Sequence, residues 1–180
     1  MGDRFGALEE KHVAFIDAQR VFFVGTAGAE GRVNVSPKGM DSLRVIDPNR
    51  IVWLNLTGSG NETAAHVLEN DRMTIMWCAF AGKPLILRAY GAARVVHPRD
   101  EKWETYTELF GEVPGARQYF ELDVDLVQTS CGFGVPLYDY VEERETLTKW
   151  AVTKGPDGVA AYWEAKNRTS LDDKPTGIFE

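Results

Sequence analysis

A glycine-rich polar turn in the stretch NLTGSGNETAAHVLEN, residues 55–70, is the first place where this sequence suggests chemistry. It separates the apolar run IVWL from a segment rich in helix formers. Gly58 and Gly60 can adopt positive φ and leave backbone N–H groups uncovered, while Ser59 or Asn61 can cap the helix. Free N–H groups and the dipole of a helix N-terminus attract an anion. The stretch therefore indicates either an ordinary capped turn or a phosphate site whose side-chain donors are Thr57, Ser59, Asn61 and Thr63.

This turn does not match the common nucleotide-binding motifs. It lacks the lysine and the spacing of a P-loop, and it does not satisfy GxGxxG. Any phosphate bound there needs a positive charge from elsewhere in the chain.

Two basic residues are candidates for such a charge. Lys38, in NVSPKG at residues 34–39, follows a strand-like segment and either supplies a compact charge for a phosphate or lies in solvent. Arg88, in LILRAYG, interrupts an apolar run and therefore either faces solvent or points to a charged partner. The pattern alone leaves both alternatives open for each residue.

The glycine turn and NVSPKG are two clusters of polar residues. A third cluster, TSCGFGVPLY at residues 129–138, follows another strand-like segment. Its glycines permit close approach of the backbone to a flat or bulky group, and Phe133 offers apolar contact; the alternative is an irregular loop. Cys131 is expected to be a small packed thiol, because no neighbouring residue indicates a lowered pKa. His12, His66 and His97 show no metal-binding spacing, so no metal site is expected.

The elements that carry these clusters are mainly short strands. Between residues 21 and 96 the sequence alternates β-rich runs with turn signals, and residues 118–131 return to an alternating strand pattern. Helical patterns interrupt or flank the strands at 8–18, 61–69, 97–111, 142–152 and 159–167. Six or so strands without regular βα alternation favour a small closed antiparallel barrel over a doubly wound parallel sheet.

Composition limits the class of partner. A chain of 180 residues predicts one globular domain. With 27 acidic and 20 basic residues and a net charge of -7, a broad basic surface for nucleic acid or anionic lipid is not expected. No apolar run approaches the roughly 20 residues of a membrane span. The N-terminus lacks an apolar signal core, so a cytoplasmic location is expected.

The order of the three clusters carries a resemblance. Segments ending in VSPKG, then TGSGNETAAHVLENDRMTIMWCAF, PLILRAYGAARVV and TSCGFGVPLY resemble the pyridoxamine 5'-phosphate oxidase-like proteins, the FMN-binding split-barrel superfamily. The resemblance spans residues 15–138. It implies a single domain, mainly β with peripheral helices, whose core is a six-stranded antiparallel split β-barrel followed by a helical extension at 139–180. It also implies a homodimer with one FMN in each of two clefts at the interface.

The resemblance also implies a cofactor site. In such proteins the flavin phosphate lies near the strand-to-helix turn and the basic end of the preceding strand, here Lys38. Ser36 and Pro37 would lie along the isoalloxazine ring and Asn55 near its polar edge, while the 131–136 loop would come from the partner subunit. The implied set is Ser36, Pro37, Lys38, Asn55, Thr57, Gly58, Ser59, Gly60, Asn61, Thr63, Arg88, Cys131, Gly132 and Phe133.

The implied activity is that of an FMN-dependent oxidoreductase acting on a small molecule, with an electron donor such as NAD(P)H. True pyridoxamine phosphate oxidases carry a Ser-Arg-Lys type phosphate clamp where this chain has Asn61, Glu62 and Thr63, so vitamin B6 oxidation is not expected. No side chain stands out as a catalytic acid or base. A flavin carrier or sensor without turnover remains an alternative, as does a split barrel using F420 or haem, although no histidine falls within the three clusters.

Overall fold

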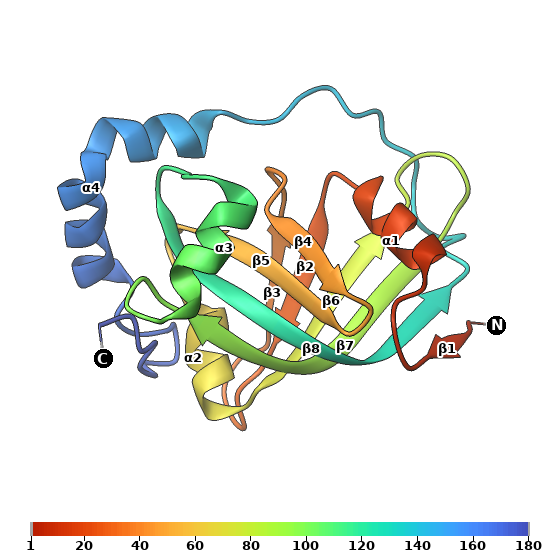
Figure 1. Cartoon of the computed structure of the whole chain (residues 1–180), viewed down its shortest axis with the longest axis horizontal. Helices are drawn as coiled ribbons and strands as arrows, with labels where there is room; N and C mark the ends of the chain where they lie inside the picture. Colours follow the sequence, from red (N-terminus) through yellow and green to blue (C-terminus); the bar gives the residue numbers. More distant parts are fainter. Residues whose placement is uncertain (1, 180) are drawn as a thin grey trace.

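One antiparallel sheet forms the core of the protein in the computed structural model, which describes residues 2–179. Its strands are β1 (Arg4–Phe5), β2 (Phe22–Thr26), β3 (Asn34–Lys38), β4 (Leu43–Asp47), β5 (Arg50–Leu56), β6 (Arg72–Cys78), β7 (Ile86–Val96) and β8 (Ala116–Ser130). The strand order is β3-β2-β6-β7-β8-β5-β4, and β1 pairs with β8. The strongly curved β7 and β8 wrap the sheet toward a barrel that stays open between its edge strands (Figure 1).

Buried and half-buried residues alternate along the strands, and the buried side chains form the core. In β2, Phe22, Val24 and Thr26 are buried, whereas the intervening residues are half-buried, as expected for a sheet with one face on the core. At the centre Trp53 stacks on Phe120 with ring centroids 4.6 Å apart. The predicted fold class, mainly β with peripheral helices, is confirmed. The expected count of six strands is too low, because eight are present between residues 2 and 179, among them the two-residue β1.

Within the described residues, four helical elements surround the sheet: α1 (Glu10–Asp17), α2 (Glu62–Glu69), α3 (Lys102–Phe110) and α4 (Thr146–Lys166). α4 is broken at Gly155, where φ is 66° and ψ is 169°, and Pro156 follows the break. The turn signal KGPDG therefore separates two helical segments, as its composition predicts. None of the helices in the described chain is long and apolar enough to cross a bilayer.

The segment between β8 and α4 determines where the site can lie. It leaves the end of β8, crosses the top of the barrel without regular structure, and brings α4 to the opposite side (Figure 1). We call residues 139–166, the later part of this crossing together with α4, the C-terminal arm. The arm covers one end of the barrel and leaves a space beneath it.

Candidate functional site

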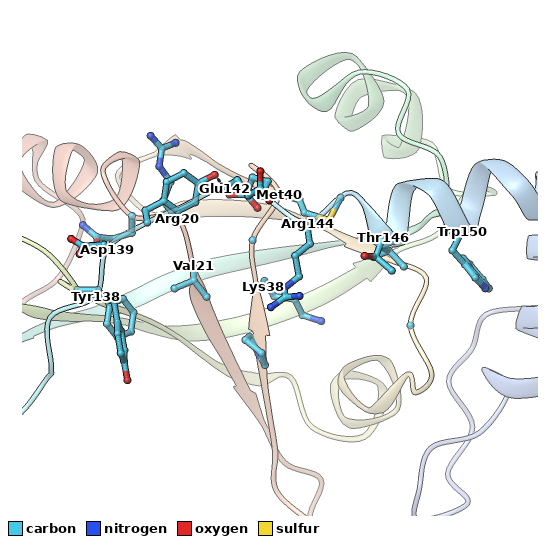
Figure 2. Close-up of a pocket in the computed structure, with 18 of the residues that line it drawn as sticks. Arg20, Val21, Lys38, Met40, Tyr138, Asp139, Glu142, Arg144, Thr146 and Trp150 are labelled. Atoms are coloured by element: carbon cyan, nitrogen blue, oxygen red, sulfur yellow. Dashed lines mark hydrogen bonds between the residues drawn. The ribbon is translucent and has the colours of Figure 1, made fainter.

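A cavity of about 1080 Å³ lies between the barrel and the C-terminal arm. Its floor includes the end of β3 and the turn after β5, and its cover is the arm (Figure 2). It is lined by Ala18, Gln19, Arg20, Val21, Pro37, Lys38, Gly39, Met40, Thr57, Gly58, Ser59, Phe80, Ala81, Tyr138, Asp139, Tyr140, Glu142, Glu143, Arg144, Thr146, Leu147, Trp150 and Tyr162. The first two clusters of the sequence thus meet in one space, and the third contributes its last residue, Tyr138.

Lys38 is the cation at the floor of this cavity. Its Nζ donates a hydrogen bond of 3.2 Å to Oδ1 of Asn55 and lies 5.3 Å from the ring centroid of Trp53. Burial and, second to it, the positive charge of Arg117 together lower the pKa of Lys38 to about 8. In the part of the chain that the structure describes, no carboxylate forms an ion pair with Lys38. Lys38 is half-buried, so its ammonium group has lost part of its hydration and gained no ion pair in return, and its place in the lining favours an anion.

The glycine turn lies beside Lys38 in the cavity lining. A Cβ built on Gly58 would meet nothing within 4 Å, so this part of the turn is open to close approach by a ligand. The carbonyl oxygens of Gly58 and Gly60 instead face the protein, where both accept hydrogen bonds from Arg117. Neither glycine has a positive φ, so the turn does not use the left-handed conformation that these glycines could adopt.

The side chains around the turn divide between the cavity and the interior. Thr57 lines the cavity, but its hydroxyl donates to the carbonyl of Gly115 at 2.8 Å and accepts from Nε1 of Trp163 at 2.8 Å. Asn61 is buried and exchanges hydrogen bonds with Gln118 instead of capping α2. These contacts make Thr57 and Asn61 anchors of the turn, and Ser59 remains the exposed hydroxyl beside the cavity.

Other members of the implied set lie outside the cavity lining. Thr63 is buried on α2 and accepts a hydrogen bond from Asn34 at 3.2 Å. Ser36 lies next to Pro37 on β3, but its hydroxyl is buried without a hydrogen-bond partner among residues 2–179. Arg88 lies half-buried on β7, where its guanidinium donates to the neutral hydroxyl of Ser130 at 3.3 Å.

The third cluster packs against its own chain. Gly132 has a φ of 67°, and a Cβ there would lie 2.8 Å from the backbone nitrogen of Leu85. The glycine is therefore required by close packing against the turn between β6 and β7. Cys131 is exposed rather than packed, which corrects the expectation of a buried thiol, and Phe133 is 82% exposed.

Sequence reasoning missed the residues that the arm contributes. Trp150 and Tyr162 form an edge-to-face pair with centroids 5.1 Å apart, and Arg144 extends from the arm on the side of the cavity where β3 ends (Figure 2). Tyr140 of the arm lines the other end beside Tyr138, the last residue of the third cluster, and Arg20 lies 5.3 Å from the ring of Tyr140. Aromatic residues at helical spacing look like core positions, so no local signal distinguishes them as cavity residues.

Residues 8–131 match the family described as Pyridoxamine 5'-phosphate oxidase. The chain belongs to this family. A curated relative, the pyridoxamine 5'-phosphate oxidase family protein ustO of Aspergillus flavus, is 41% identical over 133 residues, which are 71% of this chain and 53% of that protein. The chain therefore spans about half the length of this relative.

Solved structures agree with this assignment at the level of the fold. A putative pyridoxamine 5'-phosphate oxidase from Lactobacillus delbrueckii has a TM-score of 0.54 at 21% identity, covering 68% of this chain and 94% of that one. The FAD binding protein from Mycobacterium smegmatis has a TM-score of 0.50 at 12% identity, covering 70% and 97%. The matched part of this pyridoxamine 5'-phosphate oxidase family member contains Lys38 and the glycine turn, whereas the whole C-terminal arm lies beyond it.

Proposed function

We propose that this protein binds FMN in the cavity beneath the C-terminal arm and acts as an oxidoreductase on a small molecule. The observation that carries the proposal is a half-buried ammonium group, Lys38, which has no ion-pair partner among residues 2–179 and lines the same cavity as an open glycine turn. A dianionic phosphate supplies the missing negative charge and accepts hydrogen bonds from ammonium and backbone N–H groups.

The rest of the cavity suits the remainder of the cofactor. The isoalloxazine ring needs apolar walls, and Val21, Pro37 and Phe80 are apolar lining residues. Small-molecule sites span roughly 300–1,000 Å³, so a cavity of about 1080 Å³ has room for a flavin and a substrate beside it. The Mycobacterium smegmatis protein that shares this fold is named as an FAD binding protein, and this supports a flavin as the ligand class.

Each group of residues would have a distinct task. Lys38 and the amides of the turn bind the phosphate, and Asn55 orients the ammonium group through its 3.2 Å hydrogen bond. Arm residues such as Trp150 and Tyr162 exclude water from the bound molecules. When bound, the flavin supplies hydride and electron transfer between a donor such as NAD(P)H and an acceptor. Proton transfer is assigned to no side chain.

A second copy of the chain is the partner we propose, as the resemblance implies. On the outer face of the sheet, paired residues of four neighbouring strands form a row of side chains. Pro37 pairs with Phe23, Phe23 with Met76, and Met76 with Arg88. Val35, on the edge strand of the same face, is 65% exposed. A half-exposed apolar sheet face beside the cavity is suited to pairing two copies around the cofactor.

The ligand that copurifies with the protein tests the proposal directly. We expect a yellow protein that releases FMN on denaturation, and whose flavin is bleached by NADH or NADPH and reoxidised by an acceptor. A flavin that is bound but never turns over would support the carrier alternative, and F420 or haem in its place would identify the other cofactor classes. A colourless protein that does not bind added FMN would overturn the proposal.

The pH dependence of FMN binding follows from the lowered pKa of Lys38. The phosphate is dianionic above its second pKa of ~6. Lys38 loses its proton as pH rises through about 8, and binding then requires uptake of a proton. We expect FMN affinity to be highest near pH 7 to 8 and to fall by up to about tenfold per pH unit above that. Fluorescence titrations at pH 7.5 and 9.5 measure the change, and a pH-independent affinity would contradict the assignment of Lys38.

A further inference from the structure

A buried guanidinium holds the glycine turn from the interior side. Arg117 on β8 is 2% exposed. Its Nη1 donates to the carbonyl oxygen of Gly60 at 3.0 Å, to that of Gly58 at 3.5 Å, and to Oδ1 of Asn167 at 2.8 Å. Burial lowers the pKa of Arg117 to about 10, so the group stays charged at neutral pH. Its task in this structure is to bind carbonyl oxygens of the turn.

Asn167, the residue after α4, completes this arrangement. It is fully buried, and its Nδ2 donates to the carbonyl of Gly58 at 3.1 Å. Its own carbonyl accepts from the hydroxyl of Thr176 at 2.6 Å, which ties it to the C-terminal tail. Nearby on α4, Trp163 donates to the hydroxyl of Thr57. The turn is thus held by hydrogen bonds from a segment that lies outside residues 8–131, and residues 8–131 are the part of the chain that matches the family.

These contacts determine which way the amides of the turn point. In a trans peptide the carbonyl and the following N–H lie on opposite sides of the chain, and no cis peptide occurs in the described chain. With the carbonyls of Gly58 and Gly60 directed at Arg117, the amides of Ser59 and Asn61 point away from it. No hydrogen bond among residues 2–179 uses the amide of Ser59, whose residue lines the cavity.

We propose that Arg117 and Asn167 are positioning residues, which keep the turn at residues 57–60 in the orientation that offers the amide of Ser59 to the cofactor phosphate. This inference rests on the proposed FMN site. Arg117 acts through the carbonyls it binds, and its charge adds to the positive potential at Lys38. Asn167 links this orientation to the position of the C-terminal arm. The same contacts therefore determine the position of the arm over the cavity and the orientation of the phosphate site.

The test compares FMN with riboflavin, which has the same ring but no phosphate. Arg117→Lys keeps a positive charge but removes Nη1, the nitrogen that makes all three contacts. Asn167→Ala removes the hydrogen bonds of the Asn167 side chain to the Gly58 carbonyl and to Arg117. Arg168→Lys is the control on an exposed neighbour. We expect the Kd for FMN to rise on the order of tenfold in the first two variants, as for the loss of one charge-assisted contact. The Kd for riboflavin should stay within about twofold.

The ratio of the two Kd values separates positioning from general structure. A merely structural role would weaken FMN and riboflavin binding in parallel, and that result, or unchanged binding of both, overturns the inference. Melting temperatures of the variants identify any that fail to fold. If Arg117→Lys fails to fold, the two Kd values of Asn167→Ala decide the test. A wild-type protein that binds no flavin would overturn the proposed function and this inference with it. If the wild-type protein prefers FMN to riboflavin, but the variants lose affinity for both ligands in parallel, only this inference is overturned.

Discussion

Replacing Lys38 with Met is expected to reduce FMN affinity by about 10- to 100-fold while leaving the cofactor-free protein as stable as before or more stable. The loss follows from removing a charge-assisted hydrogen bond to the phosphate, worth about 1.5–3 kcal/mol. The gain in stability follows because Met fills a similar volume without a half-buried charge that has no ion-pair partner in the described chain. Flavin fluorescence titration and thermal unfolding of the cofactor-free protein measure the two effects.

The opposite directions of these effects make the experiment specific. A residue needed only for folding would lower both affinity and stability when replaced. Lys166→Met is the matched control, because Lys166 is exposed at the end of α4 and does not line the cavity. Unchanged FMN affinity in Lys38→Met would remove Lys38 from the site.

The second large effect is expected at Glu121, a carboxylate on β8 that is 0% exposed. Lys102 donates to it at 2.8 Å and Arg94 at 3.1 Å, and the hydroxyl of Tyr106 also donates to it. Burial by itself raises the pKa of Glu121, but these hydrogen bonds and charges overcome it and lower the pKa to about 2. The carboxylate thus joins α3 to β7 and β8 in its ionised form.

Replacing Glu121 with Ala should destabilise the protein by about 2–4 kcal/mol, because the hydroxyl of Tyr106 loses its acceptor while Lys102 and Arg94 turn to solvent. The measurement is urea unfolding at pH 7. Glu108→Ala, which changes an exposed carboxylate on α3, is the control and should stay within about 0.5 kcal/mol. A loss in Glu121→Ala no larger than in this control would show that the cluster contributes nothing.

The same carboxylate predicts how stability depends on acid. The folded pKa of Glu121 is depressed, so its contribution is complete above the unfolded value of 4.5 and is lost as pH falls toward about 2. Wild-type stability should therefore decline over this window, and more steeply than that of Glu121→Ala. Equal slopes for the two proteins would contradict the lowered pKa.

The sequence predicted the elements and two of the clusters that meet in the cavity. Alternating apolar residues revealed the strands. Lys38, which ends β3, and Ser59, in the turn after β5, both line the cavity. The helix from Glu62 to Glu69 was also expected from its glycine-rich entry. These features depend on local patterns, which is why a single sequence reveals them.

Features that depend on distant contacts could not be predicted. Asn61 and Ser59 are both plausible caps in sequence, but Gln118, far along the chain, draws Asn61 into the interior. Arg117 reads as an ordinary strand residue until the fold brings the Gly58 and Gly60 carbonyls to it. The arm forms a wall of the cavity only because β8 ends on the side of the barrel opposite α4 (Figure 1).

A structure of the protein determined with FMN tests the central claim most directly. The account predicts that the phosphate accepts hydrogen bonds from amides of the Thr57–Gly60 turn and pairs with the ammonium group of Lys38, with the ring beneath the C-terminal arm. A flavin whose phosphate lies away from this turn, or a protein that takes up no FMN at saturating concentration, would contradict it.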